Sequence, residues 1–245
     1  MATFILVAGA MHGAWVWHRV VPLLQRAGHR ALAPDLPGLG DNRSITPGEA
    51  TLAGWADFLV AGARETGGPV VLVGHSRGGH VIGEAAERAP ELLTGLVYVT
   101  AVLAQPGQNA LKAIGIHTDD SSLHPSPDAV MTMPADVALP IFYNRCTPAD
   151  AAEAGRRLCP EAHAPSATPS GVSWERWGRV PRAYVECSDD RAVPLERQRA
   201  MQALAPCDPV FTLDADHSPF FSATGPLSDA ILAAERHFAA QRART

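Results

Sequence analysis

The sequence predicts an α/β fold: a doubly wound, mostly parallel sheet with a helical cap inserted into it. Three observations predict this fold. Short apolar runs alternate with longer amphipathic segments through the first hundred residues, a proline-rich stretch then interrupts the alternation, and the alternation returns afterwards. A repeating strand–helix order is typical of parallel sheets that carry helices on both faces.

Six runs are expected to form the sheet, because each is short, mostly apolar and bounded by residues that favour turns. These strands are Phe4 to Ala8, Arg30 to Ala33, Val70 to Val73, Leu96 to Thr100, 182–187 and 209–213. Apolar residues at helical spacing predict the helices between and after them. These helices cover about 15–27, 52–66, 77–88, 194–204 and 226–241.

The interruption covers residues 104–180 and divides the chain into a core, 1–103 and 181–245, and a cap. Two helices are expected inside the cap, at 136–143 and 148–158, and no strand. Loops of this length in a compact domain are usually functional. We therefore expect the cap to cover the edge of the sheet where a site would lie.

Composition limits the class of protein. The 245 residues suit one large domain, and with a net charge of −5 and no basic run, neither nucleic acid nor a membrane is expected as a partner. The first apolar run stops at Gly9 without a charged start, which favours a strand over a signal peptide. We expect a cytoplasmic protein. Its four cysteines lack metal-ligand spacing, so no metal is expected. No other cofactor is expected either. The oligomeric state stays open.

The segment Gly74-His75-Ser76-Arg77-Gly78 fits the pattern G-x-S-x-G. It directly follows a buried strand and opens a helix, and this context gives the pattern its weight. A sharp strand-to-helix turn exposes the serine hydroxyl above the sheet, and the flanking glycines avoid clashes across the turn. We therefore expect Ser76 to be a nucleophile rather than part of a plain tight turn.

A serine nucleophile needs a base, which in turn needs an orienting acid, and in this arrangement both follow the serine in the chain. His217 is the best-placed base, since it follows the strand 209–213 and precedes the final helix. His75 and His80 are expected to be structural. The acid should follow the strand 182–187, where spacing leaves Asp189 and Asp190 as alternatives.

Catalysis at a carbonyl also needs two backbone N–H groups that stabilise the oxyanion. One is expected from Arg77, the residue after the nucleophile. The other should come from the glycine-bearing loop after the first strand, Ala8 to Gly13, and Ala10 is the predicted donor.

Several segments resemble the plant methylesterase and hydroxynitrile lyase family of the α/β hydrolases and its bacterial esterase relatives. The similar segments are Leu6 to Trp17, Ala33 to Gly38, Gly74 to Gly79, Tyr184 to Pro194 and Asp216 to Phe220. They cover both ends of the chain but not the cap. The resemblance implies an α/β-hydrolase fold with Ser76 as nucleophile, Asp190 as acid and His217 as base, and with oxyanion donors at Ala10 and Arg77.

Two positions depart from the family pattern. The family usually has a histidine where this chain has Ala8, and its hydroxynitrile lyases have a lysine directly after the catalytic histidine, where this chain has Ser218. The second departure disfavours a lyase.

The sequence therefore predicts a serine esterase that cleaves a small, apolar or aromatic carboxylic ester through an acyl-enzyme. A lyase, lactonase or cyclase acting on a secondary metabolite, or a small-molecule receptor of the same fold, are the alternatives. Apolar residues are expected to line the pocket. They are Met11, Leu103, Ile141, Phe142, Tyr143 and Phe220.

Overall fold

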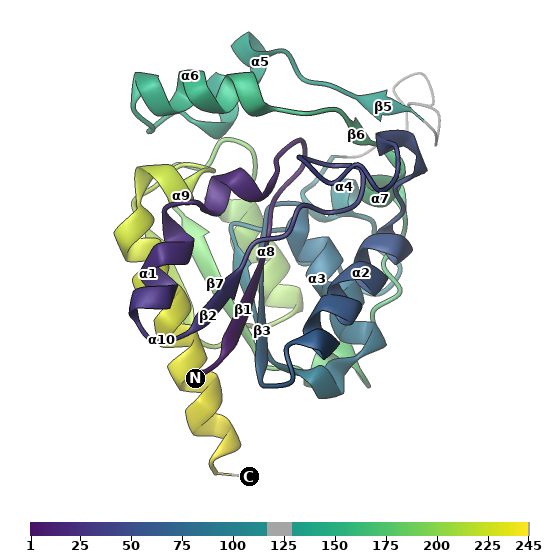
Figure 1. The fold of residues 1–245 in the computed structure, drawn as a ribbon, viewed down its shortest axis with the longest axis vertical. Coiled ribbons are helices and arrows are strands. Elements are labelled where there is room, and N and C mark those ends of the chain that lie inside the picture. The colour runs from purple at the N-terminus through teal and green to yellow at the C-terminus, as the bar shows by residue number, and fades with distance from the viewer. Residues whose placement is uncertain (117–128, 245) are drawn as a thin grey trace.

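The computed structural model describes residues 1–116 and 129–244, and a six-stranded parallel sheet forms its centre (Figure 1). The strand order is β2-β1-β3-β4-β7-β8. The strands are β1 (Thr3–Val7), β2 (Arg30–Leu32), β3 (Val70–His75), β4 (Leu93–Val99), β7 (Arg182–Cys187) and β8 (Val210–Leu213). The four central strands, β1, β3, β4 and β7, are almost entirely buried, as expected for a sheet covered on both faces. The edge strands β2 and β8 are partly exposed.

Helices cover both faces of the sheet and enclose two apolar clusters. One face carries α1 (Val20–Arg26) and α10 (Thr224–Arg242). The other carries α2 (Leu52–Glu65), α3 (Gly78–Arg88) and α8 (Leu195–Leu204). This arrangement confirms the predicted doubly wound α/β fold.

The topology determines where a site can form. The chain passes from β1 outward to β2 and then returns to the other side of β1 as β3. In such sheets, ligands bind beyond the carboxyl ends of the strands where the direction of winding changes. In this chain that point lies between the ends of β1 and β3, beside Gly9 and Ser76.

The cap contains more elements than its sequence predicts. Helices α5 (Ala135–Phe142) and α6 (Pro148–Arg157) match the two expected helices closely, but β5 (Val130–Met131) and β6 (Glu161–Ala162) form an antiparallel pair where no strand was expected. Strands of two residues are too short to show a periodic pattern. The short helices α4 (Ala110–Ala113) and α7 (Ala164–Ala167) and a 3₁₀ turn at Trp177–Arg179 also lie in the insertion and were not expected.

The first predicted helix is divided in the structure. A 3₁₀ turn covers Ala14–Trp17, and α1 begins only at Val20. Pro22 then falls in the first turn of α1, where its missing N–H needs no helical partner.

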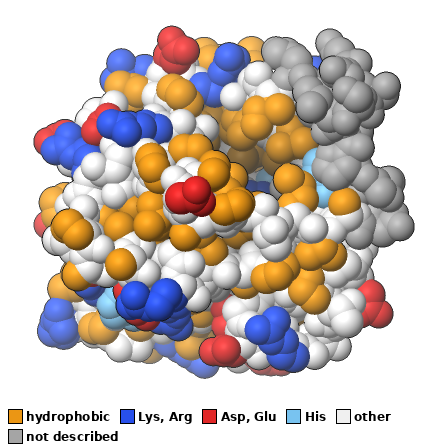
Figure 2. Space-filling model, turned by 90° about the horizontal axis from the view of Figure 1, so that it is seen from above, with side chains coloured by type: hydrophobic (Ala, Val, Ile, Leu, Met, Phe, Trp, Pro, Cys, Tyr) orange, Lys and Arg blue, Asp and Glu red, His pale blue; other side chains and the backbone are white. Residues whose placement is uncertain are grey.

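Helices α5 and α6 lie above the carboxyl edge of the sheet (Figure 1). Seen from above, hydrophobic side chains surround a hollow in this face (Figure 2). The end of the insertion returns along the core, where Nε1 of Trp177 donates to the hydroxyl of Tyr98 over 2.9 Å. Across the described ranges, no helix combines the length and apolar character needed to cross a membrane.

Candidate active site

Ser76 occupies the sharp turn between β3 and α3 with a φ of 50°. This left-handed conformation is uncommon for a residue with a side chain and is typical of a strained nucleophile turn. The neighbouring glycines make the turn possible. A Cβ atom on Gly74 would lie 2.7 Å from the carbonyl oxygen of Gly78, and one on Gly78 would lie 2.8 Å from that of Val7.

The structure brings Ser76, His217 and Asp190 together. Nε2 of His217 lies 2.9 Å from Oγ of Ser76, and its Nδ1 lies 2.7 Å from Oδ2 of Asp190. A carboxylate only accepts, so Nδ1 carries the proton and donates to Asp190. The Nε2 lone pair is then left to accept the proton of the Ser76 hydroxyl, which is the arrangement needed for a general base.

Asp190 is buried, and hydrogen bonds hold its carboxylate from two sides. Oδ1 accepts the backbone N–H groups of Ala192 and Val193 at 2.7 and 2.8 Å. Oδ2 accepts the hydroxyl of Thr100 as well as the His217 ring. These donors fix the orientation of the carboxylate.

The loop that carries His217 is held by residues on either side of it. Nε2–H of His75 donates to the backbone carbonyl of His217 over 2.7 Å. The buried carboxylate of Asp216 accepts the N–H of Ser218 at 3.0 Å and, from the cap, the N–H of Arg145 at 2.8 Å. His75 thus supports the base from behind, in line with its expected structural role. Ser218 is fully buried and does not line the cavity described below.

The two predicted oxyanion donors lie beside the nucleophile. Ala10 and Arg77 both line the same cavity as Ser76. Within the part of the chain that the structure describes, neither backbone N–H has a hydrogen-bond partner. Two unpaired amides beside a serine hydroxyl are free to bind a developing negative charge.

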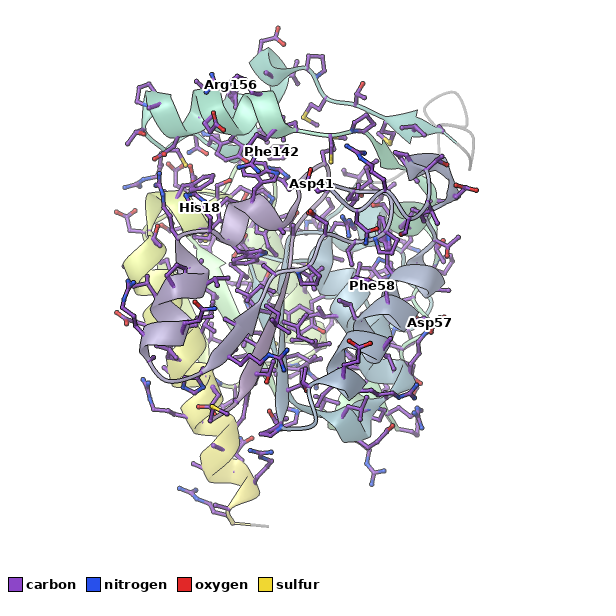
Figure 3. The ribbon with its side chains drawn as sticks, in the orientation of Figure 1. His18, Asp41, Asp57, Phe58, Phe142 and Arg156 are labelled. Carbon is purple, nitrogen blue, oxygen red and sulfur yellow. The ribbon has the colours of Figure 1, made fainter. Side chains whose placement is uncertain are left out.

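The cavity above Ser76 has a volume of about 400 Å³ and walls that are largely apolar. Met11 and Phe142 line it, as the sequence predicts, and so does Ile141. Phe142 lies between the cap helices and the sheet (Figure 3), with its ring 5.4 Å from that of His217. Further apolar walls come from Val102, Leu111, Ile114, Ile116, Met131, Met133, Ala162 and Val193.

Three expected pocket residues, Leu103, Phe220 and Tyr143, do not line this cavity, and here the sequence prediction is wrong. Leu103 is buried in the core, and its backbone N–H faces the sulfur of Met201. Phe220 is fully buried, with its ring 5.7 Å from that of Trp17. Both side chains face the core, which the order of residues alone does not show.

Tyr143 also lies outside the cavity, in contact with His12. Its hydroxyl lies 2.5 Å from Nε2 of His12, and Nδ1 of His12 lies 2.5 Å from the carbonyl oxygen of Ala10. Burial lowers the pKa of His12 to about 4, so the ring is neutral: Nδ1–H donates to Ala10, and Nε2 accepts from Tyr143. The sequence gives no signal for this series of hydrogen bonds, because it joins two segments that lie far apart in the sequence.

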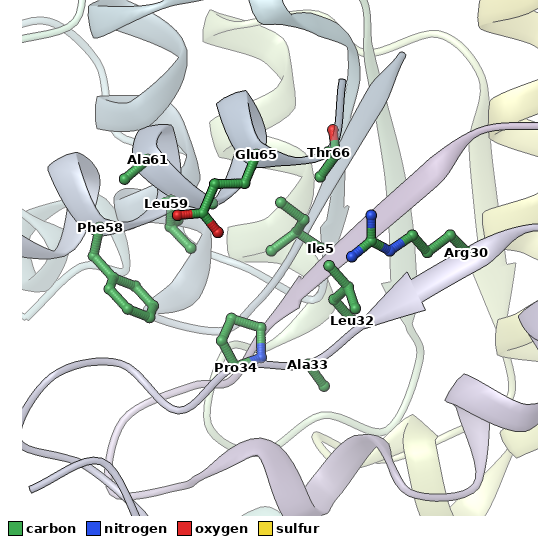
Figure 4. Close-up of a pocket in the computed structure, with 11 residues that line it drawn as sticks. Ile5, Arg30, Leu32, Ala33, Pro34, Phe58, Leu59, Ala61, Glu65 and Thr66 are labelled. Atoms are coloured by element: carbon green, nitrogen blue, oxygen red, sulfur yellow. The ribbon is translucent and has the colours of Figure 1, made fainter. Parts of the chain in front are cut away.

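A second hollow of about 390 Å³ lies beside β2 and α2 (Figure 4). Its charged lining residues are Arg30 and Glu65, and its described lining includes no histidine. It therefore offers no serine–base pair. In the described ranges, no cluster of three or more His, Cys, Asp or Glu residues is arranged to hold a metal ion.

Comparison with known proteins indicates the family to which the chain belongs. Residues 4–230 match the family described as "Alpha/beta hydrolase family". Methylesterase 1 of Arabidopsis thaliana is 31% identical, with 94% of each chain covered. A pyrethroid hydrolase of Sphingobium wenxiniae is also 31% identical, with 93% of this chain and 85% of the relative covered. Two chloroplastic relatives from A. thaliana are longer: the chain spans 60% and 53% of their lengths.

Solved structures show the same architecture. The crystal structure of polyneuridine aldehyde esterase superposes with a TM-score of 0.83 at 26% identity, covering 95% of this chain and 98% of that one. A pyrethroid hydrolase from Sphingobium faniae superposes with a TM-score of 0.78 at 25% identity, covering 96% and 98%. From its sequence match and its fold, the chain belongs to the α/β-hydrolase family.

Proposed function

We propose that this protein is a serine esterase that hydrolyses small carboxylic esters with apolar or aromatic groups. The observation that carries the proposal is the hydrogen-bonded series Ser76–His217–Asp190 at an apolar cavity of about 400 Å³. Ester hydrolysis requires a nucleophile, a base and an oxyanion site. Several relatives are also named esterases or methylesterases.

In the proposed reaction, His217 takes the proton of Ser76 as its oxygen attacks the ester carbonyl. The N–H groups of Ala10 and Arg77 stabilise the oxyanion, and Asp190 stabilises the imidazolium. His217 then protonates the leaving alcohol. Water, activated by the same ring, releases the acid from the acyl-enzyme.

The test is turnover of p-nitrophenyl acetate and butyrate by the wild type and by Ser76→Ala. We expect the variant to fold normally and to lose at least about three orders of magnitude in kcat, as triad knockouts do. Undiminished turnover in Ser76→Ala would remove Ser76 from the mechanism. If the wild type binds these esters without turning them over, the protein is a receptor instead. If it cleaves mandelonitrile, it is a lyase.

A further inference from the structure

Residues of the cap form hydrogen bonds to the loop that carries one of the two oxyanion donors. The backbone N–H of Met11, next to Ala10, donates to Oε2 of the cap residue Glu161 over 2.8 Å. The carbonyl of Met11 accepts the backbone N–H of Cys159 over 3.0 Å. Met11 itself has a φ of 61°, a left-handed conformation that persists only where its surroundings hold it. The N–H and the carbonyl of this residue are thus bonded to the cap, at Glu161 in β6 and at Cys159 just before it.

The same carboxylate also holds the segment that carries the other donor. Nε of Arg77 lies 3.0 Å from Oε1 of Glu161, and Nη2 lies 3.0 Å from Oε2. Nη2 also donates to the carbonyl of Gly9 over 3.1 Å, and the guanidinium lies 4.3 Å from the centre of the Trp55 ring. Only 4% of each side chain of the ion pair is exposed.

Glu161 is therefore bonded to both segments from which the oxyanion donors come. A buried ion pair is weak grounds for a role in stability, because apolar residues of similar size often replace one without loss. Donor position, in contrast, strongly affects rate: losing one donor costs about 10²–10³ in kcat, and small misplacements of reacting groups are also costly.

We propose that Glu161 is a positioning residue of the oxyanion site. From the cap, it holds Met11 and the Arg77 side chain so that the amides of Ala10 and Arg77 stay directed at one point. The inference rests on the esterase function proposed above. It assigns part of the catalytic geometry to a segment that otherwise shapes the substrate pocket.

Glu84 offers a matched control. It is a buried carboxylate on α3 that also bonds the insertion, accepting the N–H of Gly171 at 2.6 Å and the hydroxyl of Ser170 at 2.9 Å. No hydrogen bond or ion pair links it to the segments 9–11 or 76–78 in the described structure. If Glu161 only joined the cap to the core, its removal should affect activity no more than the removal of Glu84 does.

The experiment compares Glu161→Ala, Glu161→Gln and Glu84→Ala. It measures kcat and KM for p-nitrophenyl acetate, the melting temperature, and inhibition by a trifluoromethyl ketone, whose serine adduct carries an oxyanion. We expect Glu161→Ala to lose about 10- to 100-fold in kcat, with a parallel loss of inhibitor affinity and KM within about threefold. Glu161→Gln should recover part of the loss, because its amide oxygen can still accept from Met11. Glu84→Ala should lower the melting temperature and leave kcat and inhibition unchanged.

Equal kcat in Glu161→Ala and Glu84→Ala, or unchanged inhibitor affinity in Glu161→Ala, would overturn the inference. If Glu161→Ala does not fold, the double variant Arg77→Met with Glu161→Leu removes both charges and keeps apolar volume. It should fold and still lose kcat and inhibitor affinity; wild-type values would overturn the proposal. If the wild type shows no turnover, the esterase function is contradicted. The role of Glu161 is then tested by inhibitor affinity alone, which should still fall in Glu161→Ala.

Discussion

Asp190 lies 2.7 Å from Nδ1 of His217, while Asp189, its neighbour in the chain, faces the surface and contacts the cap. Oδ2 of Asp189 accepts from the side-chain amide of Asn144 over 3.0 Å. Successive residues beyond a strand point in different directions, so one of two adjacent carboxylates reaches the imidazole and the other cannot.

The two carboxylates should therefore differ sharply when each is neutralised. We expect Asp190→Asn to lower kcat by about three to four orders of magnitude, because an amide neither stabilises the imidazolium nor enforces its tautomer. Asp189→Asn should stay within a fewfold of the wild type. Parallel kcat measurements on one p-nitrophenyl ester test this, and a larger loss in Asp189→Asn would contradict the assignment.

Phe142 should control substrate choice. Its removal enlarges the cavity by one ring beside His217, so Phe142→Ala should accept bulkier acyl groups. Discrimination among esters should change by roughly 1–3 kcal/mol. The measurement is kcat/KM for acetate, butyrate, octanoate and benzoate esters.

The control for this series is Phe221→Ala. Phe221 is also a partly buried aromatic residue, stacked at 6.1 Å on Trp15, but it does not line the cavity. Its variant should keep the wild-type ranking of esters. The same ranking in Phe142→Ala would show that this ring does not contact the substrate.

Acid should destabilise the fold through buried neutral histidines. Burial lowers the pKa of His12 and of His80 to about 4, whereas the unfolded chain titrates near 6.5. Between these values the unfolded state binds more protons, so the free energy of unfolding falls as the pH falls. Each histidine contributes up to about 1.4 kcal/mol per pH unit.

His80→Leu isolates one of these contributions. Neither ring nitrogen of His80 has a hydrogen-bond partner in the described structure, so the apolar replacement removes the titration without breaking a bond. Urea unfolding at several values between pH 4.5 and 6.5 should show a shallower dependence in the variant. An identical slope in both proteins would mean that His80 is not held neutral by the fold.

The sequence predicts the sheet well, and it predicts that Ser76 and His217 lie at one edge of it, for a physical reason. A buried strand, a glycine-flanked serine and a helix are adjacent in the chain, so their geometry is local. His217 follows from the rule that the carboxyl ends of parallel strands share one edge. The choice of Asp190 as the acid required the family resemblance as well, because spacing alone does not distinguish it from Asp189.

The pocket could not be predicted in the same way. Leu103 and Phe220 are apolar and close in sequence to site residues, yet their side chains turn into the core. Glu161 lies in a two-residue strand with no periodic pattern, and its partners are distant in the chain. Contacts of this kind depend on how the cap packs against the core, and no local sequence pattern predicts that packing.

The buried Arg77–Glu161 ion pair limits how this protein can diversify. A carboxylate buried without its guanidinium, or the reverse, leaves an uncompensated charge. We expect residues 77 and 161 to change together among relatives. Where the residue after the serine is uncharged, the residue at position 161 should not be acidic. A chimera that receives a foreign cap would need the matching residue 77 from the same donor. New specificities should therefore arise more readily from substitutions within this cap than from exchanging it whole.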